Sequence, residues 1–314
     1  MDELRFGKSK KEKLNTMNLE QLVSKAKNKS NFVDLGAFIK FCDEYLNYIS
    51  DHLQATIISQ NENHYRFFQY KEEGNFQITR PINSNLMYDA KDFSKASKEY
   101  LKLLQNIKTN NKKDQSIRTI LNNVTYTIQQ SIGSALDGLP ARQSNTARKL
   151  NGDLFEHLIR LILGKMGMDC RSGTIQFSVV IDGKSEFQMR YQHDLIIEKE
   201  EEVRLIGSIK TSSKDRVDKI FIDKFLYNKL AEKETPHIAI FLNDVQRKNA
   251  RCENQYGINT TFLPGRFKGY TVKLNPLDGV YYCDIRPNMQ TEHILKDHIK
   301  TFDHLLMEDI WKFV

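Results

Sequence analysis

The chain has 314 residues, and its 47 Lys and Arg against 40 Asp and Glu give a net charge of +7. This length favours about two domains, and 18 Phe with 13 Tyr argue against general disorder. No segment has the ~18 consecutive apolar residues of a transmembrane helix, and the N-terminal segment lacks the apolar core of a signal peptide. We therefore expect a cytoplasmic protein that makes no membrane contact.

The cysteines, Cys42, Cys170, Cys252 and Cys283, are isolated and form no CxxC pair. This spacing does not support a zinc finger, and a disulfide framework is not typical of so long a chain. We expect reduced thiols. The positive net charge permits binding to nucleic acid but does not require it.

The N-terminal part of the chain shows mostly helical spacing of its apolar residues. Helices are expected within 31–53, from about Asp92 to 107 and within 118–136, and segment 64–81 alternates weakly, which indicates a hairpin with its turn at Glu73-Gly74. A DGLP turn follows at 137–140. We predict a mostly helical N-terminal region over 1–138 and an α/β region over 139–314.

After this turn, helices and strands are predicted to alternate. An amphipathic helix is expected from about Gly152, with Phe155 and Leu158 on its apolar face and Gly167 as its C-terminal cap. Strands are expected at 174–181, 187–198, 203–212, 237–244 and 269–276, with a tight turn at Asp182-Gly183 and a helix at 215–233.

An acidic residue and a lysine are predicted to meet on two neighbouring strands. Asp194 precedes the apolar run 195–197, and Lys210 ends the next strand, with Glu201-Glu202 between them as a hairpin turn. Such a pair suits hydrolysis of a phosphodiester. A carboxylate can hold Mg²⁺, which polarises the phosphate and lowers the pKa of a bound water. The lysine can orient or deprotonate that water and offset charge in the transition state.

One carboxylate is not enough for a hard cation, and the sequence offers two further acids near this pair. Asp223 lies 13 residues after Lys210 on the following helix, where it could fold back over the strand ends. Glu156 lies on the long helix, off its apolar stripe.

These residues resemble the PD-(D/E)xK nuclease superfamily, and specifically its type II restriction endonucleases, in which an acid on one strand is followed by acid-x-Lys on the next. Ser208-Ile209-Lys210 stands at the acid-x-Lys position, similar to the branch that cuts CCGG, CCNGG or related sites and takes the missing carboxylate from the helix after the lysine. Asp223 matches that displaced position, where many members carry Glu, and Glu156 resembles the helix glutamate before the first strand. His193 replaces the eponymous proline. The resemblance covers roughly 142–285.

The same branch places base-reading residues straight after the lysine, as Arg-acid-Arg, and this chain has Lys214-Asp215-Arg216. An Arg can take both major-groove acceptors of guanine, and an acid can accept from cytosine N4. Arg216 would then read G and Asp215 would read C. Lys214 departs from the pattern, because a lysine cannot donate the two parallel hydrogen bonds that an arginine makes to guanine.

The resemblance implies a restriction-endonuclease-like core, a mixed central sheet flanked by helices, with an N-terminal region that helps dimerisation or grips DNA. It implies Mg²⁺-dependent cleavage of double-stranded DNA at a short G/C-containing palindrome. Asp194 and Asp223 would hold metal, Glu156 would be a further carboxylate, Lys210 would activate water, and Ser208 would fill the vacated acidic position. A homodimer is expected for a two-fold symmetric target, and a companion DNA methyltransferase is the implied functional partner.

Two other functions remain open at this point. A DNA repair or structure-selective nuclease with the same core would cut without sequence preference. A DNA-binding protein without catalysis would use these residues for structure only, with Asp223 paired to Lys219 and Glu156 paired to Arg160 on their helices, and with Asp215 as a helix cap.

Overall fold

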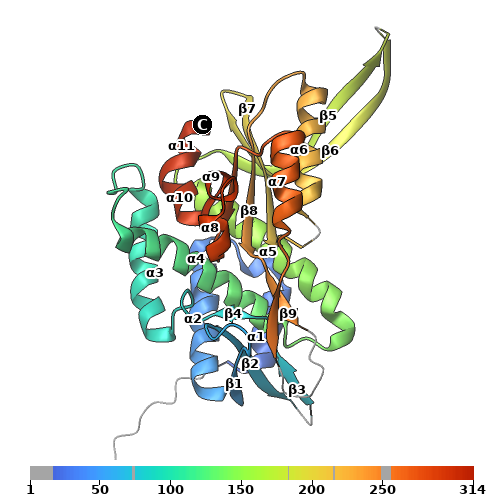
Figure 1. Cartoon of the computed structure of the whole chain (residues 1–314). Helices are drawn as coiled ribbons and strands as arrows, with labels where there is room; N and C mark the ends of the chain where they lie inside the picture. Colours follow the sequence, from blue (N-terminus) through green and yellow to red (C-terminus); the bar gives the residue numbers. More distant parts are fainter. Residues whose placement is uncertain (1–16, 73–74, 183, 215, 249–255) are drawn as a thin grey trace, which may run out of the picture.

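A computed structural model describes residues 17–72, 75–182, 184–214, 216–248 and 256–314 (Figure 1). The elements of the N-terminal part are α1 (Leu19–Lys27), η1 (Lys29–Asn31), α2 (Leu35–His52), β1 (Ala55–Ile58), β2 (Tyr65–Glu72), β3 (Asn75–Ile78), β4 (Ile82–Asn83), α3 (Ala90–Gln105), α4 (Gln115–Leu136) and η2 (Ala141–Gln143). The following elements are α5 (Ser144–Lys165), β5 (Cys170–Ile181), β6 (Lys184–Lys199), β7 (Glu202–Ser212), α6 (Val217–Ala231), β8 (His237–Asn243), β9 (Val245–Lys248), β10 (Gly257–Thr260), α7 (Pro264–Lys273), β11 (Gly279–Tyr282), α8 (Pro287–Thr291), α9 (Leu295–His298), β12 (Ile299–Thr301), α10 (Phe302–His304), the π-helical segment η3 (Leu305–Asp309) and α11 (Ile310–Phe313).

A six-stranded mixed sheet forms the centre of the C-terminal part, in the order β12-β11-β8-β7-β6-β5. Strands β5, β6 and β7 form an antiparallel meander, whereas β7, β8, β11 and β12 run parallel. Every residue of β8 is buried, as expected for a parallel strand that is covered on both faces. The predicted mixed sheet flanked by helices is thereby confirmed.

The N-terminal part is mostly helical, as predicted, whereas one predicted strand of the C-terminal part is wrong. The N-terminal part contains a four-stranded sheet, β1–β4, beside its helices; the expected hairpin is its β2–β3 pair, and the turn at 73–74 lies outside the described residues. Segment 269–276, predicted as a strand, instead forms the end of helix α7 and the residues after it. Pro264 fits the first helical position, and Phe267 and Thr271, four residues apart, are the buried residues of this helix.

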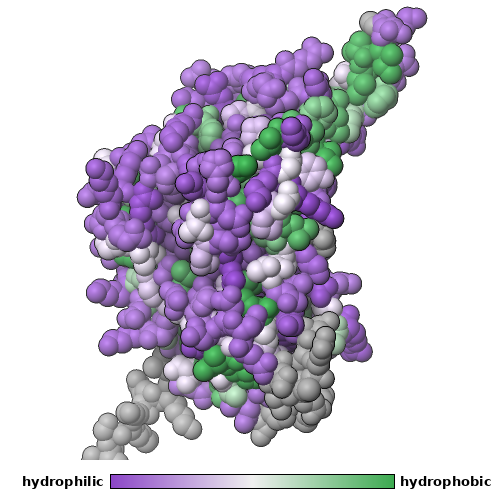
Figure 2. Space-filling model, viewed as in Figure 1, coloured by the Kyte–Doolittle hydropathy of each residue, from purple (hydrophilic) through white to green (hydrophobic). Residues whose placement is uncertain are grey.

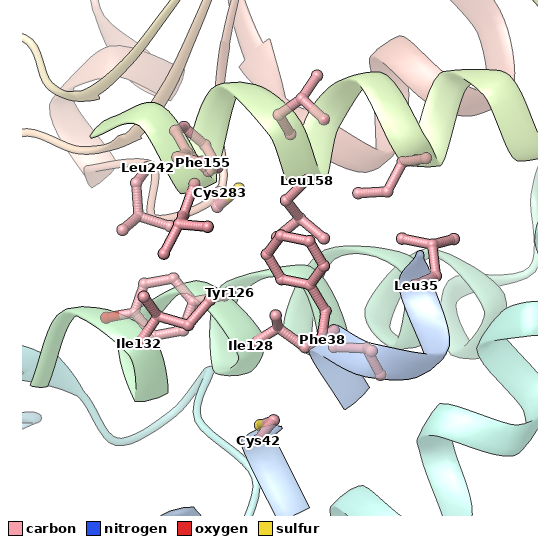
Figure 3. Close-up of a cluster of buried hydrophobic side chains, with 14 of the residues drawn as sticks. Leu35, Phe38, Cys42, Tyr126, Ile128, Ile132, Phe155, Leu158, Leu242 and Cys283 are labelled. Atoms are coloured by element: carbon pink, nitrogen blue, oxygen red, sulfur yellow. The ribbon is translucent and has the colours of Figure 1, made fainter. Parts of the chain in front are cut away.

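Helix α4 lies in the middle of the core. All of its residues from Leu121 to Leu136 are buried, polar ones included. Buried polar groups need partners, and Gln129 Nε2 donates to the main-chain oxygen of Asn151 at 3.0 Å. Figure 3 shows Tyr126 and Ile128 of α4 in one cluster with Phe38 of α2 and Leu158 of α5.

This core crosses the predicted boundary at residue 138. A single hydrophobic cluster joins residues of α1–α5 to residues of β6, β7 and β8 and of the C-terminal helical segments. The two regions therefore pack against each other through buried side chains, and the division at 138 stays a prediction. Cys42, Cys170 and Cys283 are free; Cys252 lies outside the described residues. None of the helices in the described ranges is long and apolar enough to cross a membrane.

Two histidines are buried between the sheet and helix α6. His193 of β6 packs against the ring of Tyr227, with centroids 5.2 Å apart, and His237 of β8 is fully buried. Burial lowers the pKa of His193 from 6.5 to about 4 and that of His237 to about 3. Between about pH 4 and pH 6.5, both imidazoles are therefore neutral in the folded protein, whereas the same histidines are protonated in the unfolded chain.

Acid should destabilise the protein through these histidines. Below pH 6.5 the unfolded state gains protons that the folded state takes up only near pH 3 to 4, so the free energy of unfolding falls as the pH falls through this window. Denaturant titrations from pH 6 to 4 should show a pH slope smaller by about 1.4 kcal/mol per pH unit in His237→Gln than in the wild type.

The comparison of slopes isolates His237 from other buried groups. The pKa of Asp244, raised by burial to about 7, contributes a slope of opposite sign that is present in both proteins. Above pH 7 the histidine is neutral in both states, so the two slopes should there be equal. Equal slopes between pH 6 and 4 would contradict the assignment.

Candidate active site

A bulge in strand β6 positions Asp194. The register of β5 and β6 shifts between the pairs Arg171–Ile196 and Gly173–His193. Between these pairs, β5 has one residue and β6 has two, so the extra residue lies in β6. A bulge of this kind re-aims a side chain and is common beside functional sites. The carboxylate of Asp194 accepts a hydrogen bond from the main-chain N–H of Ile209 on β7 at 2.9 Å, which fixes its orientation.

Lys210 joins two carboxylates from different elements. Its amine Nζ forms an ion pair with Asp194 Oδ2 of β6 and another with Glu156 Oε1 of α5, the latter at 3.2 Å. The three side chains are partly buried, with 19–29% of their surface exposed. The structure therefore brings together Asp194, Lys210 and Glu156, three of the residues that the sequence suggests for catalysis.

Two carboxylates, those of Asp194 and Glu156, share the single positive charge of Lys210. Burial, and after it the charge of Asp194, raises the pKa of Glu156 above 4.5, while the charge of Lys210 opposes the shift. One ammonium compensates only one of two carboxylates when both are ionised. An additional cation would relieve the remaining repulsion.

These carboxylates suit a Mg²⁺ ion. In the described part of the chain, no three histidine, cysteine or acidic residues are grouped to hold a metal ion. Mg²⁺ commonly uses only one or two carboxylates and completes its shell with substrate phosphate and water. The pair Asp194 and Glu156, held by one lysine, therefore fits Mg²⁺ once a phosphate is bound.

The other two predicted catalytic residues form hydrogen bonds with side chains outside this group. Asp223 of α6 accepts a hydrogen bond from the hydroxyl of Tyr191 at 2.8 Å, and its role as a metal ligand stays a prediction. The hydroxyl of Ser208 lies 3.2 Å from Nε2 of His237. Ser208 thus contacts a buried, neutral histidine.

A large cleft of about 2640 Å³ opens beside the acid–lysine group and is lined by both parts of the chain. Glu156 and Lys210 stand in its wall, with Lys214 and Arg216 from the segment after β7. Lys214 and Arg216 are exposed, whereas Asp215 lies outside the described residues. The basic residues that line this cleft are Lys27, Arg80, Arg148, Lys149, Lys210, Lys214, Arg216, Arg247 and Lys248.

Some of these residues carry no signal in the sequence. Lys27 and Arg80 come from the N-terminal part and reach the cleft only through the fold. Arg160, which the non-catalytic alternative pairs with Glu156, donates from Nη1 to the main-chain oxygen of Asp194 at 3.0 Å. It thereby ties helix α5 to the bulge in β6.

No protein-family model matches the sequence, and the search of curated proteins gives no match. Among solved structures, the crystal structure of the type IIP restriction endonuclease Kpn2I is similar over 94% of this chain and 97% of its own, with a TM-score of 0.69 and 18% identity. The complex of the restriction endonuclease PspGI with substrate DNA matches 70% of this chain and 90% of its own, with a TM-score of 0.40 and 15% identity. The Kpn2I match extends over the N-terminal part as well, and the chain has the fold of a restriction endonuclease.

Proposed function

We propose that this protein is a type II restriction endonuclease that cuts double-stranded DNA with Mg²⁺ at a short G/C-containing palindrome of the CCGG or CCNGG kind. The observation that carries the proposal is the contact of the Lys210 amine with both Asp194 and Glu156 at the wall of a basic cleft. The fold shared with Kpn2I supports it.

Each residue of the group has a separate task in this proposal. Asp194, oriented by the N–H of Ile209, and Glu156 would hold Mg²⁺ against the scissile phosphate. A bound Mg²⁺ supplies Lewis-acid activation of the phosphate and of a water. The amine of Lys210 would orient or deprotonate that water and offset the negative charge that develops on the phosphate oxygens. The products would carry 5′-phosphates.

The cleft would hold the DNA. Its basic side chains come from both parts of the chain, so the N-terminal part would grip the phosphate backbone through residues such as Lys27. Arg216 would read guanine by a bidentate contact, and Lys214 would make a single contact beside it. Asp215, between them in the sequence, would accept from cytosine.

A palindromic target has two-fold symmetry, so two copies of the chain would act on it together. The proposed activity would be exercised on DNA in the cytoplasm. It would also require a companion DNA methyltransferase that protects the host's own sites.

Digestion of a supercoiled plasmid tests the proposal. The wild-type protein with Mg²⁺ should give discrete fragments, and Lys210→Ala should reduce cleavage by about 10³-fold or more, because one group both activates water and stabilises the transition state. Binding of the same DNA, measured by fluorescence anisotropy, should be largely retained.

Lys165→Ala is the matched control, because this lysine is exposed and does not line the cleft. A smear of fragments would favour a repair or structure-selective nuclease, and no cutting at all would leave a DNA-binding protein without catalysis. Full activity of Lys210→Ala would remove this lysine from the mechanism.

Substitution can decide whether Glu156 or Asp223 holds the metal together with Asp194. Glu156→Gln should weaken Mg²⁺ binding, measured by calorimetry, by about tenfold or more, and Asp223→Asn should have the smaller effect, because Asp223 contacts Tyr191 rather than Lys210. Since the pKa of Glu156 is raised above 4.5, acidification should protonate it early, and wild-type Mg²⁺ affinity should fall as the pH is lowered through that pKa. A larger loss in Asp223→Asn would assign the metal to Asp223.

Substitution of Arg216 tests whether this residue reads a base, by measuring DNA binding and the sites of cleavage. Arg216→Ala should cost about 1–3 kcal/mol of binding to the target and relax the preference for guanine at one position. Arg204→Ala is the control, because Arg204 lies near the other end of β7 and does not line the cleft. Unchanged cleavage sites at full rate would show that Arg216 reads no base.

A further inference from the structure

The hairpin of β5 and β6 forms an arm that projects from the body of the protein (Figure 1). Helix α6 covers its base, where Phe177 packs edge-on against Tyr227 with centroids 5.3 Å apart. Towards its tip the arm carries exposed apolar side chains: Val180 is 58% exposed, Ile181 51% and Phe187 53%. Figure 2 shows this stretch as a hydrophobic patch on a largely hydrophilic surface.

The outer edge of this arm is unpaired. Strand β5 ends the six-stranded sheet, and no strand in the described ranges pairs with its other side. Its residues 174–181, TIQFSVVI, contain no proline and no charged residue. Lysines, prolines or other charges usually protect such an edge from pairing with another chain. The main-chain groups of this edge are therefore open to a further strand.

A second apolar patch lies on the neighbouring helix. Ile222 and Phe225 of α6 are 50% and 43% exposed, although Ile220 and Phe221 of the same helix are buried. Helix α6 packs beside the base of β5. The protein thus exposes one apolar patch at the tip of the arm and another near its base.

The charge of the arm favours a protein partner over DNA. Between residues 174 and 191, Asp182 and Glu186 balance Lys184 and Arg190, so the net charge is zero, whereas elements that grip DNA carry an excess of positive charge. An uncharged strand can pair with a copy of itself without repulsion. Antiparallel pairing about a two-fold axis also places the tip of each arm beside the base of the other.

We propose that two copies of this chain associate through this arm. Strand β5 of each copy pairs antiparallel with β5 of the other, and the tip residues Val180 and Phe187 pack on Ile222 and Phe225 of the partner copy. The choice of a second copy rests in part on the proposed function, in which a two-fold symmetric target needs two chains. Strand β6 forms one half of the arm and also contains Asp194. The proposed dimer contact and the acid–lysine group would therefore be connected through one strand.

Sedimentation analysis of the full chain, without DNA or metal, tests the proposal. The wild type should be a dimer, and the double variant Val180→Lys/Phe187→Lys should raise the dimer dissociation constant by roughly tenfold or more. Ile222→Lys, on the patch that receives the tip, should weaken the dimer as well. The thermal unfolding of each variant, followed by circular dichroism, should match the wild type because the substituted side chains are exposed.

Val33→Lys and Val272→Lys are the controls, because these valines are 72% and 59% exposed elsewhere on the surface; both should remain dimers. Arm variants that dimerise like the wild type would overturn the proposal, and so would a wild type that stays monomeric. Arm variants that dimerise normally but lose DNA affinity would assign the arm to DNA instead. Since no cleavage is measured, failure of the nuclease proposal would not alter these readouts.

Discussion

Helix α5 links the hydrophobic core to the acid–lysine group, and its rotation about its own axis is the constraint on which the site depends. Phe155 and Leu158 are fully buried in the core, and this burial fixes the helix in one orientation. Glu156, between them in the sequence, must then point away from the core, where it reaches Lys210. The partly buried carboxylate of Glu156 is held beside Asp194, and burial together with the charge of Asp194 raises its pKa. An additional cation would relieve this repulsion.

The sheet supplies the matching constraint from the other side. The bulge in β6 and the N–H of Ile209 set the direction of the Asp194 carboxylate, and Arg160 ties α5 to the main chain of the same residue. The shared core around α4 then holds the N-terminal part against the C-terminal part. The two walls of the cleft are therefore positioned by buried packing, which the proposed binding of a rigid DNA duplex would require.

The sequence predicts the parts of the site that depend on local rules. Spacing along two neighbouring strands suffices to place Asp194 near Lys210, and the apolar stripe of the long helix suffices to exclude Glu156 from the core. The position of Asp223 depends on the rotation of α6, and this helix carries apolar residues on several sides, so its sequence does not fix which face meets the sheet. The alternation of segment 269–276 predicts a strand, but the segment continues a helix whose start is indicated by Pro264. The continuous core across residue 138 depends on long-range contacts that no local pattern reveals.

The central claim is that the acid–lysine group cuts DNA at one defined sequence, and sequencing the ends of plasmid fragments made by the wild-type protein with Mg²⁺ tests it most directly. The account predicts that every end derives from the same short G/C-containing palindrome, cut symmetrically on both strands and leaving 5′-phosphates. Ends that are scattered over the plasmid without a common sequence would contradict it.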